Sequence, residues 1–318
     1  MSSNLPKSDE DCLRSLDEVI VHDSPLRLVL EEHSAWLADT GGRQADFLSA
    51  DLFGIDLRGV DLRKAILRKA NLKESNLSGA KLSGADMAGI ILERADLTHV
   101  TLAETNIMDS DLENARLCEA DLRGSSLAGA NLSDARIDGC NFTGASLRDA
   151  RMYDVWLHSC NFSQAKLERA RLNRAEISEC DFSGANLENA KLLRARINKT
   201  WFTNALMGGS ILTSIKARDC KFRGAGMDGA KFNEADLRQS SFFMVSASGC
   251  DFRSANLSSV DFAFAVLTKA RFSDAILLAT DFQGSTLLDA RDISSRQLFQ
   301  ARTTETTILP TGDLGPFA

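Results

Sequence analysis

The chain has 318 residues, of which 44% are hydrophobic and 25% charged, and its formal net charge is −7. It contains no run of about 18 apolar residues, so the sequence predicts no membrane-spanning helix. The acidity lies in the first 44 residues, which hold four Lys or Arg against nine Asp or Glu; residues 45–290 hold 30 against 32, which excludes a polyanionic chain.

Residues 1–44 predict two short helices. Ser8 and Asp11 have the spacing of a capping box and precede apolar residues at helical spacing as far as Ile20. Pro25 stands at the first position of a second helix, which Gly41-Gly42 ends. We expect residues 1–44 to cap the repeat that follows, because the first unit of a stacked array otherwise exposes unpaired backbone and core side chains. Docking of a partner is the alternative role.

From Ala45 to Ala290 a five-residue pattern recurs without a change of register. Every position divisible by five is Ala, Ser, Thr, Cys, Val or Ile, and 28 of these 50 residues are Ala. We call this residue the foot, and the large apolar residue two positions later the centre. Of 49 centres, 27 are Leu and 12 are Phe, and only Ala217 and Ala247 are small.

A period of five fits neither a helix nor a long strand. The foot and the centre are two residues apart, so within a short extended segment they point the same way. The following positions favour turns, as in Leu77-Ser78-Gly79. Each pentad therefore predicts a very short strand and a corner, and successive coils of the chain pair at roughly 4.8 Å.

This pattern, as in Ala185-Asn186-Leu187-Glu188-Asn189, resembles the A-(D/N)-L-x-x consensus of the pentapeptide-repeat family. The resemblance covers Ala45–Ala290 and implies an all-β solenoid, a right-handed quadrilateral β-helix with four pentads in each coil. A coil of 20 residues also follows from the sequence itself, because Phe recurs every 20 residues from Phe142 to Phe282. We expect a domain division into a short helical N-terminal cap (1–44), the β-helix (45–290) and a small C-terminal cap (291–318).

After Ala290 the register slips by one residue, and Arg296–Ala301 predicts a short helix. Similar tails close many proteins of this family, and in some members the C-terminal end also forms a dimer. The resemblance thus implies a cap, with homodimerisation through this end as a further possibility.

The sequence indicates no catalytic, cofactor or metal site. The 20-residue period stacks Cys118, Asp138 and His158 in one outer column, but a convex solenoid wall offers no pocket, so we predict a non-enzymatic protein. Five of the seven cysteines occupy foot positions, which predicts buried, reduced thiols. Residues 1–10 lack the basic and apolar regions of a secretory signal, and we expect a cytoplasmic location.

Outward positions supply the candidate binding residues. Middle coils carry basic residues on two adjacent faces, and large apolar residues occupy outward positions nearby; the alternative is an ordinary solvated face. The candidate partner-binding residues are Trp156, Trp201, Leu206, Ile211, Arg151, Arg171, Lys191 and Arg196. The candidates for self-association are Phe243, Met244 and Phe264, unless the tail folds back over them.

Together these features predict a protein–protein interaction or scaffold module that uses the lateral faces of a rigid rod to bind a protein partner. The resemblance implies an alternative. Family members of the quinolone-resistance type mimic B-DNA and bind type II topoisomerase (gyrase). Direct binding of nucleic acid through the basic strip is the weaker reading, because the charge of the repeat is balanced.

Overall fold

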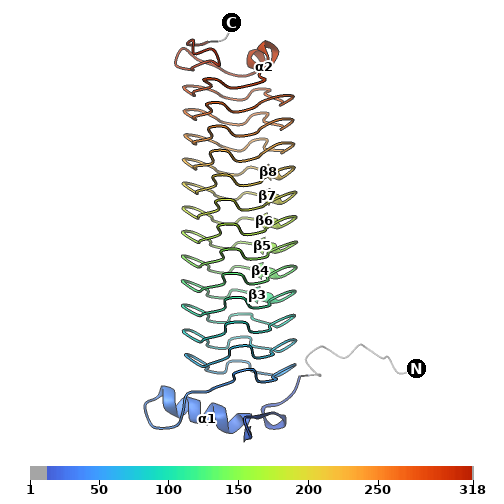
Figure 1. Cartoon of the computed structure of the whole chain (residues 1–318), viewed down its shortest axis with the longest axis vertical. Helices are drawn as coiled ribbons and strands as arrows, with labels where there is room; N and C mark the ends of the chain where they lie inside the picture. The colour runs from blue at the N-terminus through green and yellow to red at the C-terminus, as the bar shows by residue number, and fades with distance from the viewer. Residues whose placement is uncertain (1–12, 317–318) are drawn as a thin grey trace, which may run out of the picture.

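A computed structural model of the chain describes residues 13–316, which form a straight rod with the two ends of the chain at opposite ends of its long axis (Figure 1). Each outward residue next to a foot pairs in parallel with the residue 20 positions later, from Asp46↔Ile66 to Arg271↔Arg291. One coil therefore contains four pentads, one on each of four faces, and the expected quadrilateral β-helix is confirmed. We call one such coil a rung, so that residues 20 positions apart lie on consecutive rungs.

One face of the rod carries a regular six-stranded parallel sheet, whereas the others are joined by single-residue bridges. The strands are β3 (Arg116–Cys118), β4 (Arg136–Asp138), β5 (Trp156–His158), β6 (Glu176–Ser178), β7 (Arg196–Asn198) and β8 (Lys216–Arg218). Three of the centres on this sheet are Ile137, Ile177 and Ile197. A β-branched side chain favours extended backbone, which is consistent with three-residue strands here.

The corners explain the polar residues of the pentad. The second residue after each centre has a left-handed backbone, with φ of 66° at Gly184 and 57° at Asn189, a conformation that Gly, Asn and Asp tolerate best. The residue before the centre holds the turn, since Asn186 Oδ1 accepts a hydrogen bond from the Glu188 N–H at 3.0 Å. Asp46 does the same for the N–H of Leu48 at 2.9 Å. The early acidic residues thus have a structural role.

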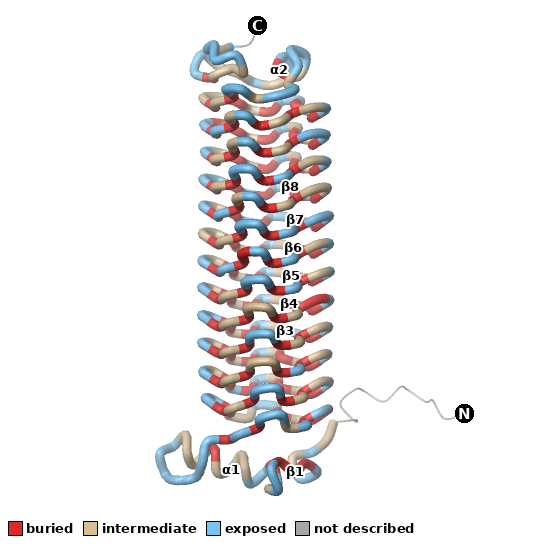
Figure 2. Tube along the Cα trace, in the orientation of Figure 1, coloured by how far each residue is buried: buried red, intermediate tan, exposed pale blue. Residues whose placement is uncertain are grey.

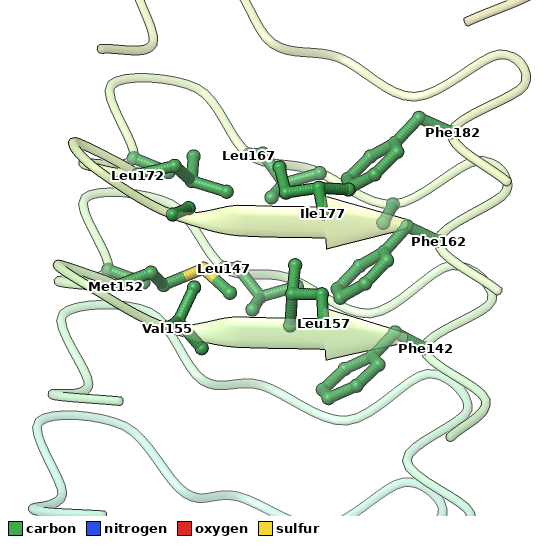
Figure 3. Packing of buried hydrophobic residues seen from close by; sticks show 14 of the residues in the cluster. Phe142, Leu147, Met152, Val155, Leu157, Phe162, Leu167, Leu172, Ile177 and Phe182 are labelled. Carbon is green, nitrogen blue, oxygen red and sulfur yellow. The ribbon is translucent and has the colours of Figure 1, made fainter. Parts of the chain in front are cut away.

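Feet and centres fill the interior of the rod, so buried and exposed residues alternate around every coil (Figure 2). The rings of Phe142, Phe162 and Phe182 stack with centroids 4.5 and 4.7 Å apart (Figure 3). A second ladder begins at Phe232 and meets the first edge to face, with 6.4 Å between the centroids of Phe222 and Phe232. The core is therefore continuous along the rod.

The N-terminal segment differs from the prediction of two helices. Residues 13–25 contain a 3₁₀ helix (Leu16–Glu18) and two short paired strands, β1 (Ile20–Val21) and β2 (Ser24–Pro25). The predicted helix as far as Ile20 is wrong, and its capping pair Ser8 and Asp11 lies outside the described residues. The reason is the open edge of the first coil: the Arg14 N–H donates to the Gly54 carbonyl at 2.7 Å, and the Asp56 N–H donates to the Arg14 carbonyl at 3.1 Å. A helix has no free backbone groups in its interior with which to pair this edge.

The second predicted helix is confirmed as α1 (Leu26–Leu37), which lies across the end of the rod (Figure 1). Its residues Leu26 and His33 are fully buried. The Nδ1 atom of His33 accepts a hydrogen bond from the Ala45 N–H at 3.0 Å, so the imidazole joins the helix to the first foot. Burial lowers the pKa of His33 below its ordinary value, and the ring stays neutral.

At the other end the coil lengthens before it stops. Asp281 pairs with Arg302, 21 residues later, and Thr286 pairs with Ile308, 22 residues later, which confirms the predicted slip. The predicted helix forms as α2 (Ser295–Gln300), with a capping box between Ser294 and Gln297. Its Leu298 is buried, and the Gln297 side chain donates to two carbonyls of the last full coil. Within the described residues no helix is long and apolar enough to cross a membrane.

Candidate protein-interaction surface

A straight column of basic residues runs along the face next to the six-stranded sheet. Arg151, Arg171, Lys191, Ile211 and Lys231 are successive bridge partners, so they occupy one outward position on consecutive rungs. We call them the cationic column. Its four basic residues are exposed and Ile211 is half-buried. At roughly 4.8 Å per rung, three of the charges follow one another without a break.

The basic residues of the cationic column form no direct ion pair with the described residues, although Asp149, which is paired with Arg169, also acts on Arg171 through its charge. Elsewhere on the rod an arginine is often neutralised within its own pentad: Arg63 lies 2.8 Å from Asp61, and this hydrogen-bonded guanidinium lowers the pKa of the Asp61 carboxyl. Among the described residues, none of the four forms an ion pair, and Arg171 donates only to the Tyr153 hydroxyl, at 3.3 Å. Their positive potential is therefore left for a partner or for solvent ions.

The corner beside the column adds charge and apolar surface. Arg194, two positions after the Lys191 pentad's centre, also forms no ion pair with any described residue, whereas Arg174 one rung before it is paired with Asp154. The side chain of Leu193 is 37% exposed between Lys191 and Arg194. The aliphatic side chain of Leu193 thus lies between two cations, Lys191 and Arg194, that form no ion pair with any described residue.

A groove lies on the outer surface of the six-stranded sheet, with a volume of about 410 Å³. Its lining residues are Trp156, Glu176, Ile177, Ser178, Arg196, Ile197, Asn198, Lys216 and Arg218. We call it the sheet groove. The first and third residues of β6, β7 and β8 form its two walls, and the buried centres Ile177 and Ile197 lie between them. The prediction that the solenoid wall offers no pocket is therefore wrong, because three-residue strands make this face flatter and leave two parallel rows of side chains.

Trp156 closes one end of the sheet groove. The guanidinium of Arg136 lies 4.6 Å from the centre of its ring, and the imidazole of His158 stacks beside it with centroids 5.5 Å apart. His158 Nδ1 is 2.9 Å from Ser178 Oγ on the next strand. Trp156 is thus held in place by neighbours on two sides and presents its remaining surface to the groove.

The predicted outer column of Cys118, Asp138 and His158 does form, since the three residues are paired on β3, β4 and β5. The hydrogen bond of His158 goes to Ser178, and no bond joins it to Asp138 among the described residues. Nor does any group of three or more His, Cys, Asp or Glu in the described chain have the arrangement of a metal site. The next residue of this column, Ser178, is the first one that lines the groove.

The charges of the sheet groove are unevenly compensated. Arg196 lies 3.4 Å from Glu176, and Arg218 lies 2.5 Å from Asp236 beyond the end of the groove. Asp236 also binds Arg238, at 2.8 Å, and these two guanidinium groups, Arg238 first, lower the pKa of its carboxyl. Lys216 forms no ion pair with any described residue. Both faces of this corner of the rod are thus net basic.

The structure brings together only some of the predicted partner-binding residues. Arg151, Arg171, Lys191 and Ile211 share the cationic column, and Trp156 and Arg196 line the sheet groove. Trp201 pairs with Asp181 and Lys221, and Leu206 pairs with Asn186 and Gly226, on two other columns. Because one pentad turns the chain by one face, Trp201, Leu206 and Ile211 lie on three different faces and form no common patch.

Sequence reasoning did not single out the groove residues Ser178, Asn198 and Arg218 as site residues. Their position depends on the flat strands of one face, whereas the pentad pattern is the same on all four. The usable indication was the Ala-x-Ile form of the pentads around Ile137, Ile177 and Ile197, in place of Ala-x-Leu.

The predicted self-association residues lie close together near the C-terminal end. The rings of Phe243 and Phe264 meet edge to face with centroids 5.7 Å apart, and Arg223 lies over Phe243 at 5.0 Å. Met244 is 54% and Phe264 50% exposed, so the described part of the tail leaves them accessible. Association of two chains through this patch stays a prediction.

The chain resembles the solved structure of HetL, a pentapeptide repeat protein involved in heterocyst differentiation regulation from the cyanobacterium Nostoc sp. strain PCC 7120. The two are 21% identical over 89% of this chain and 97% of HetL, with a TM-score of 0.41. The fluoroquinolone resistance protein QnrB1 in its full-length form is 19% identical over 56% of this chain and 94% of its own, with a TM-score of 0.34.

A pentapeptide repeat protein from the Arabidopsis thaliana thylakoid lumen is 31% identical over 34% of this chain and 71% of its own, with a TM-score of 0.17. A comparison with curated protein sequences finds no match. The family models give the clearest result: "Pentapeptide repeats (8 copies)" matches four segments between residues 45 and 164, and "Pentapeptide repeat region" matches residues 155–232 and 215–291. The chain belongs to the pentapeptide-repeat family.

Proposed function

We propose that the chain is a non-enzymatic protein-interaction module whose rigid rod binds a protein partner through the corner formed by the cationic column and the sheet groove. The observation that carries this proposal is the run of Arg151, Arg171 and Lys191 on consecutive rungs without an ion pair. Arginine and aromatic side chains are enriched at protein interfaces and among the residues that contribute most to binding.

The rest of the molecule supports a binding role rather than a catalytic one. Beside the groove, His158 is hydrogen-bonded to the groove residue Ser178, but no described acidic side chain orients the imidazole from its other nitrogen. A nucleophile activated by a base needs that orientation and a set of donors for the developing negative charge. The rod instead offers fixed outward positions at a regular spacing, which suits recognition of an extended surface.

The test is a capture experiment with two matched variants of the whole chain. R171E/K191E reverses two charges of the cationic column, and K166E/K221E makes the same change in net charge on the two other faces. We expect the wild type and K166E/K221E to retain the same protein partners by quantitative mass spectrometry, and R171E/K191E to lose them. Equal retention by all three chains, with equal thermal unfolding, would contradict the proposal.

Removal of the aromatic side chain tests the groove separately. W156A is compared with W201A, because Trp201 is 45% exposed on another face of the rod. We expect W156A to weaken capture of the same partners and W201A to leave it unchanged. The opposite result would assign the binding surface to the face that carries Trp201.

Binding of gyrase by mimicry of B-DNA is distinguished by the same variants. A duplex mimic needs an acidic face, whereas the described middle coils present uncompensated cations on two faces. A supercoiling assay with purified gyrase, with and without a quinolone, is expected to show no effect at micromolar concentrations of the chain. Inhibition or protection that R171E/K191E leaves unchanged would support mimicry instead.

We further propose a cytoplasmic location. The six cysteines of the described chain are free, and five of them are buried foot residues. Desolvation raises the pKa of the Cys220 thiol to about 12, so the thiol is protonated and inert. Free buried thiols suit a reducing compartment.

A further inference from the structure

We propose that the cationic column recognises an acidic α-helix of the partner, laid parallel to the axis of the rod, with carboxylates on one stripe of that helix. The inference rests on the proposed function, and it names the chemistry and secondary structure of the partner. Three observations carry it: the absence of ion pairs along the column, the spacing of its charges, and the aliphatic residues beside them.

The charges first require an anionic ligand. Arg151, Arg171, Lys191 and Lys231 are exposed and form no ion pair with any described residue. Arginines beside other columns are paired even at the surface, as Arg123 is with Asp121 at 2.7 Å and Arg238 with Asp236 at 2.8 Å. A partner that supplies carboxylates here would complete the pattern that the rod follows elsewhere.

The spacing then selects among anionic chains. Arg151 and Lys191 are two rungs apart, which is roughly 9.6 Å at the usual distance between paired strands. Seven residues of an α-helix rise about 10.5 Å, so side chains at i, i+4 and i+7 face three successive rungs with a mismatch of about 1 Å. An extended strand repeats on one face every 6.7 Å or so, and its carboxylates fall out of step after one rung.

The neighbouring side chains favour protein over single-stranded nucleic acid. Leu193 and Ile211 stand beside Lys191 on the same face, and aliphatic surface of this kind packs against the apolar edge of an amphipathic helix. Single-stranded nucleic acid is held by stacking of its bases on aromatic rings. Tyr153, which lies in the same pentad as Arg151, is half-buried and hydrogen-bonded to Arg171.

The test uses three blocked synthetic peptides of identical composition and a fluorescent label, with the full-length chain. In the first, a helix of about 20 residues rich in alanine carries glutamates at i, i+4, i+7 and i+11 on one stripe, with leucines beside them. In the second, the same glutamates are distributed around the helix. The third has the residue order of the first, but its two central alanines are D-alanine, which disrupts the helix. Fluorescence anisotropy at low salt measures the affinities.

We expect the striped helix to bind the wild-type chain roughly tenfold more tightly than either control peptide, as several exposed charge pairs acting together allow. R171E/K191E should lose this preference and K166E/K221E should keep it. L193S should weaken binding of the striped helix and leave the salt dependence of its affinity unchanged. Circular dichroism and thermal unfolding of each variant confirm that the rod is intact.

Three results would overturn the inference. Equal affinity for all three peptides would show that charge acts without regard to helical spacing. Tighter binding of the disrupted peptide would indicate an extended partner, and tighter binding of an oligothymidylate of equal charge would indicate a nucleic acid. If R171E/K191E loses its captured partner while the striped helix shows no preference, the interaction module stands and the helical partner is wrong.

Discussion

The guanidinium of Arg136 lies 4.6 Å from the centre of the Trp156 ring, one rung before it on the same outward column. This contact fixes the aromatic end of the sheet groove. We predict that R136A lowers the free energy of unfolding by about 0.5–1 kcal/mol, because a cation over an indole contributes about that much at an exposed site. A double-mutant cycle with W156L, measured by urea unfolding, should return the same coupling energy. Additive effects of the two substitutions would contradict the contact.

Phe162 tests the stacked core. It lies between Phe142 and Phe182, with centroid distances of 4.5 and 4.7 Å, and is fully buried. F162A should cost about 3–5 kcal/mol of unfolding free energy, and F162L clearly less, since Leu fills most centres of the rod. Hydrogen exchange should show lost protection in the coils next to residue 162 and unchanged protection near α1 and α2, as expected of nearest-neighbour stability. Uniform loss of protection along the rod would contradict the expectation that each coil is stabilised mainly by its neighbours.

Gly284 tests the packing of the C-terminal apolar patch. Its φ is +62°, and a Cβ atom there would lie 2.8 Å from the ring of Phe264. Gly144 has φ of +67° and nothing within 4 Å of such an atom. Both G284A and G144A carry the strain of a left-handed alanine, about 1 kcal/mol. We expect G284A to lower the melting temperature further, and the F264A background to remove the difference; a difference that persists in F264A would assign it to the backbone.

His33 predicts a dependence of stability on pH. Burial is the main cause that lowers its folded-state pKa; the backbone of Arg63 and the charge of Asp61 act in the opposite direction, and the charge of Arg63 acts in the same one. Below the ordinary pKa of 6.5 the unfolded chain therefore binds a proton that the folded chain does not, and the free energy of unfolding falls as the pH falls. H33Q should flatten this dependence between pH 7.5 and about 5.5, above the range in which paired carboxylates titrate.

Thermal unfolding at a series of pH values measures this effect, and hydrogen exchange locates it. We expect the loss at low pH to begin in α1 and the first coil, because His33 joins them through the Ala45 N–H. A slope that H33Q retains, or a loss that begins at α2, would show that another group controls this pH range.

Most of the fold followed from the sequence because each pentad repeats the same physical requirement. A small foot and a large centre two residues later must face one interior, and the recurrence of Phe142, Phe162 and Phe182 set the coil at 20 residues. The cap at the N-terminal end was less accessible. Arg14 is extended because its backbone pairs with that of Gly54 and Asp56. The residues around Arg14 have helical spacing, and they give no indication of a contact 40 residues away.

The candidate site divides in the same way. The cationic column follows from arithmetic on residue numbers, since Arg151, Arg171 and Lys191 differ by 20. The same period places Trp201 and Ile211, which are 10 residues apart, on opposite faces. The prediction that grouped them as one binding surface did not take this into account. The sheet groove needs the third residue of each strand, such as Ser178 and Asn198, to stand as a wall, and this depends on how flat one face is.

The 20-residue period also means that the rod can change length only in whole coils without losing its surface. Excision of residues 161–180 would join Cys160 to Asp181, shorten the rod by one rung and keep every residue beyond the junction on its original face. Excision of five residues from the same place would rotate the remainder by a quarter turn. Lys216 and Arg218 would then leave the face of Trp156, although core, charge and composition would barely change. In the evolution of such a chain, insertions and deletions therefore affect function by changing which residues share a face of the rod.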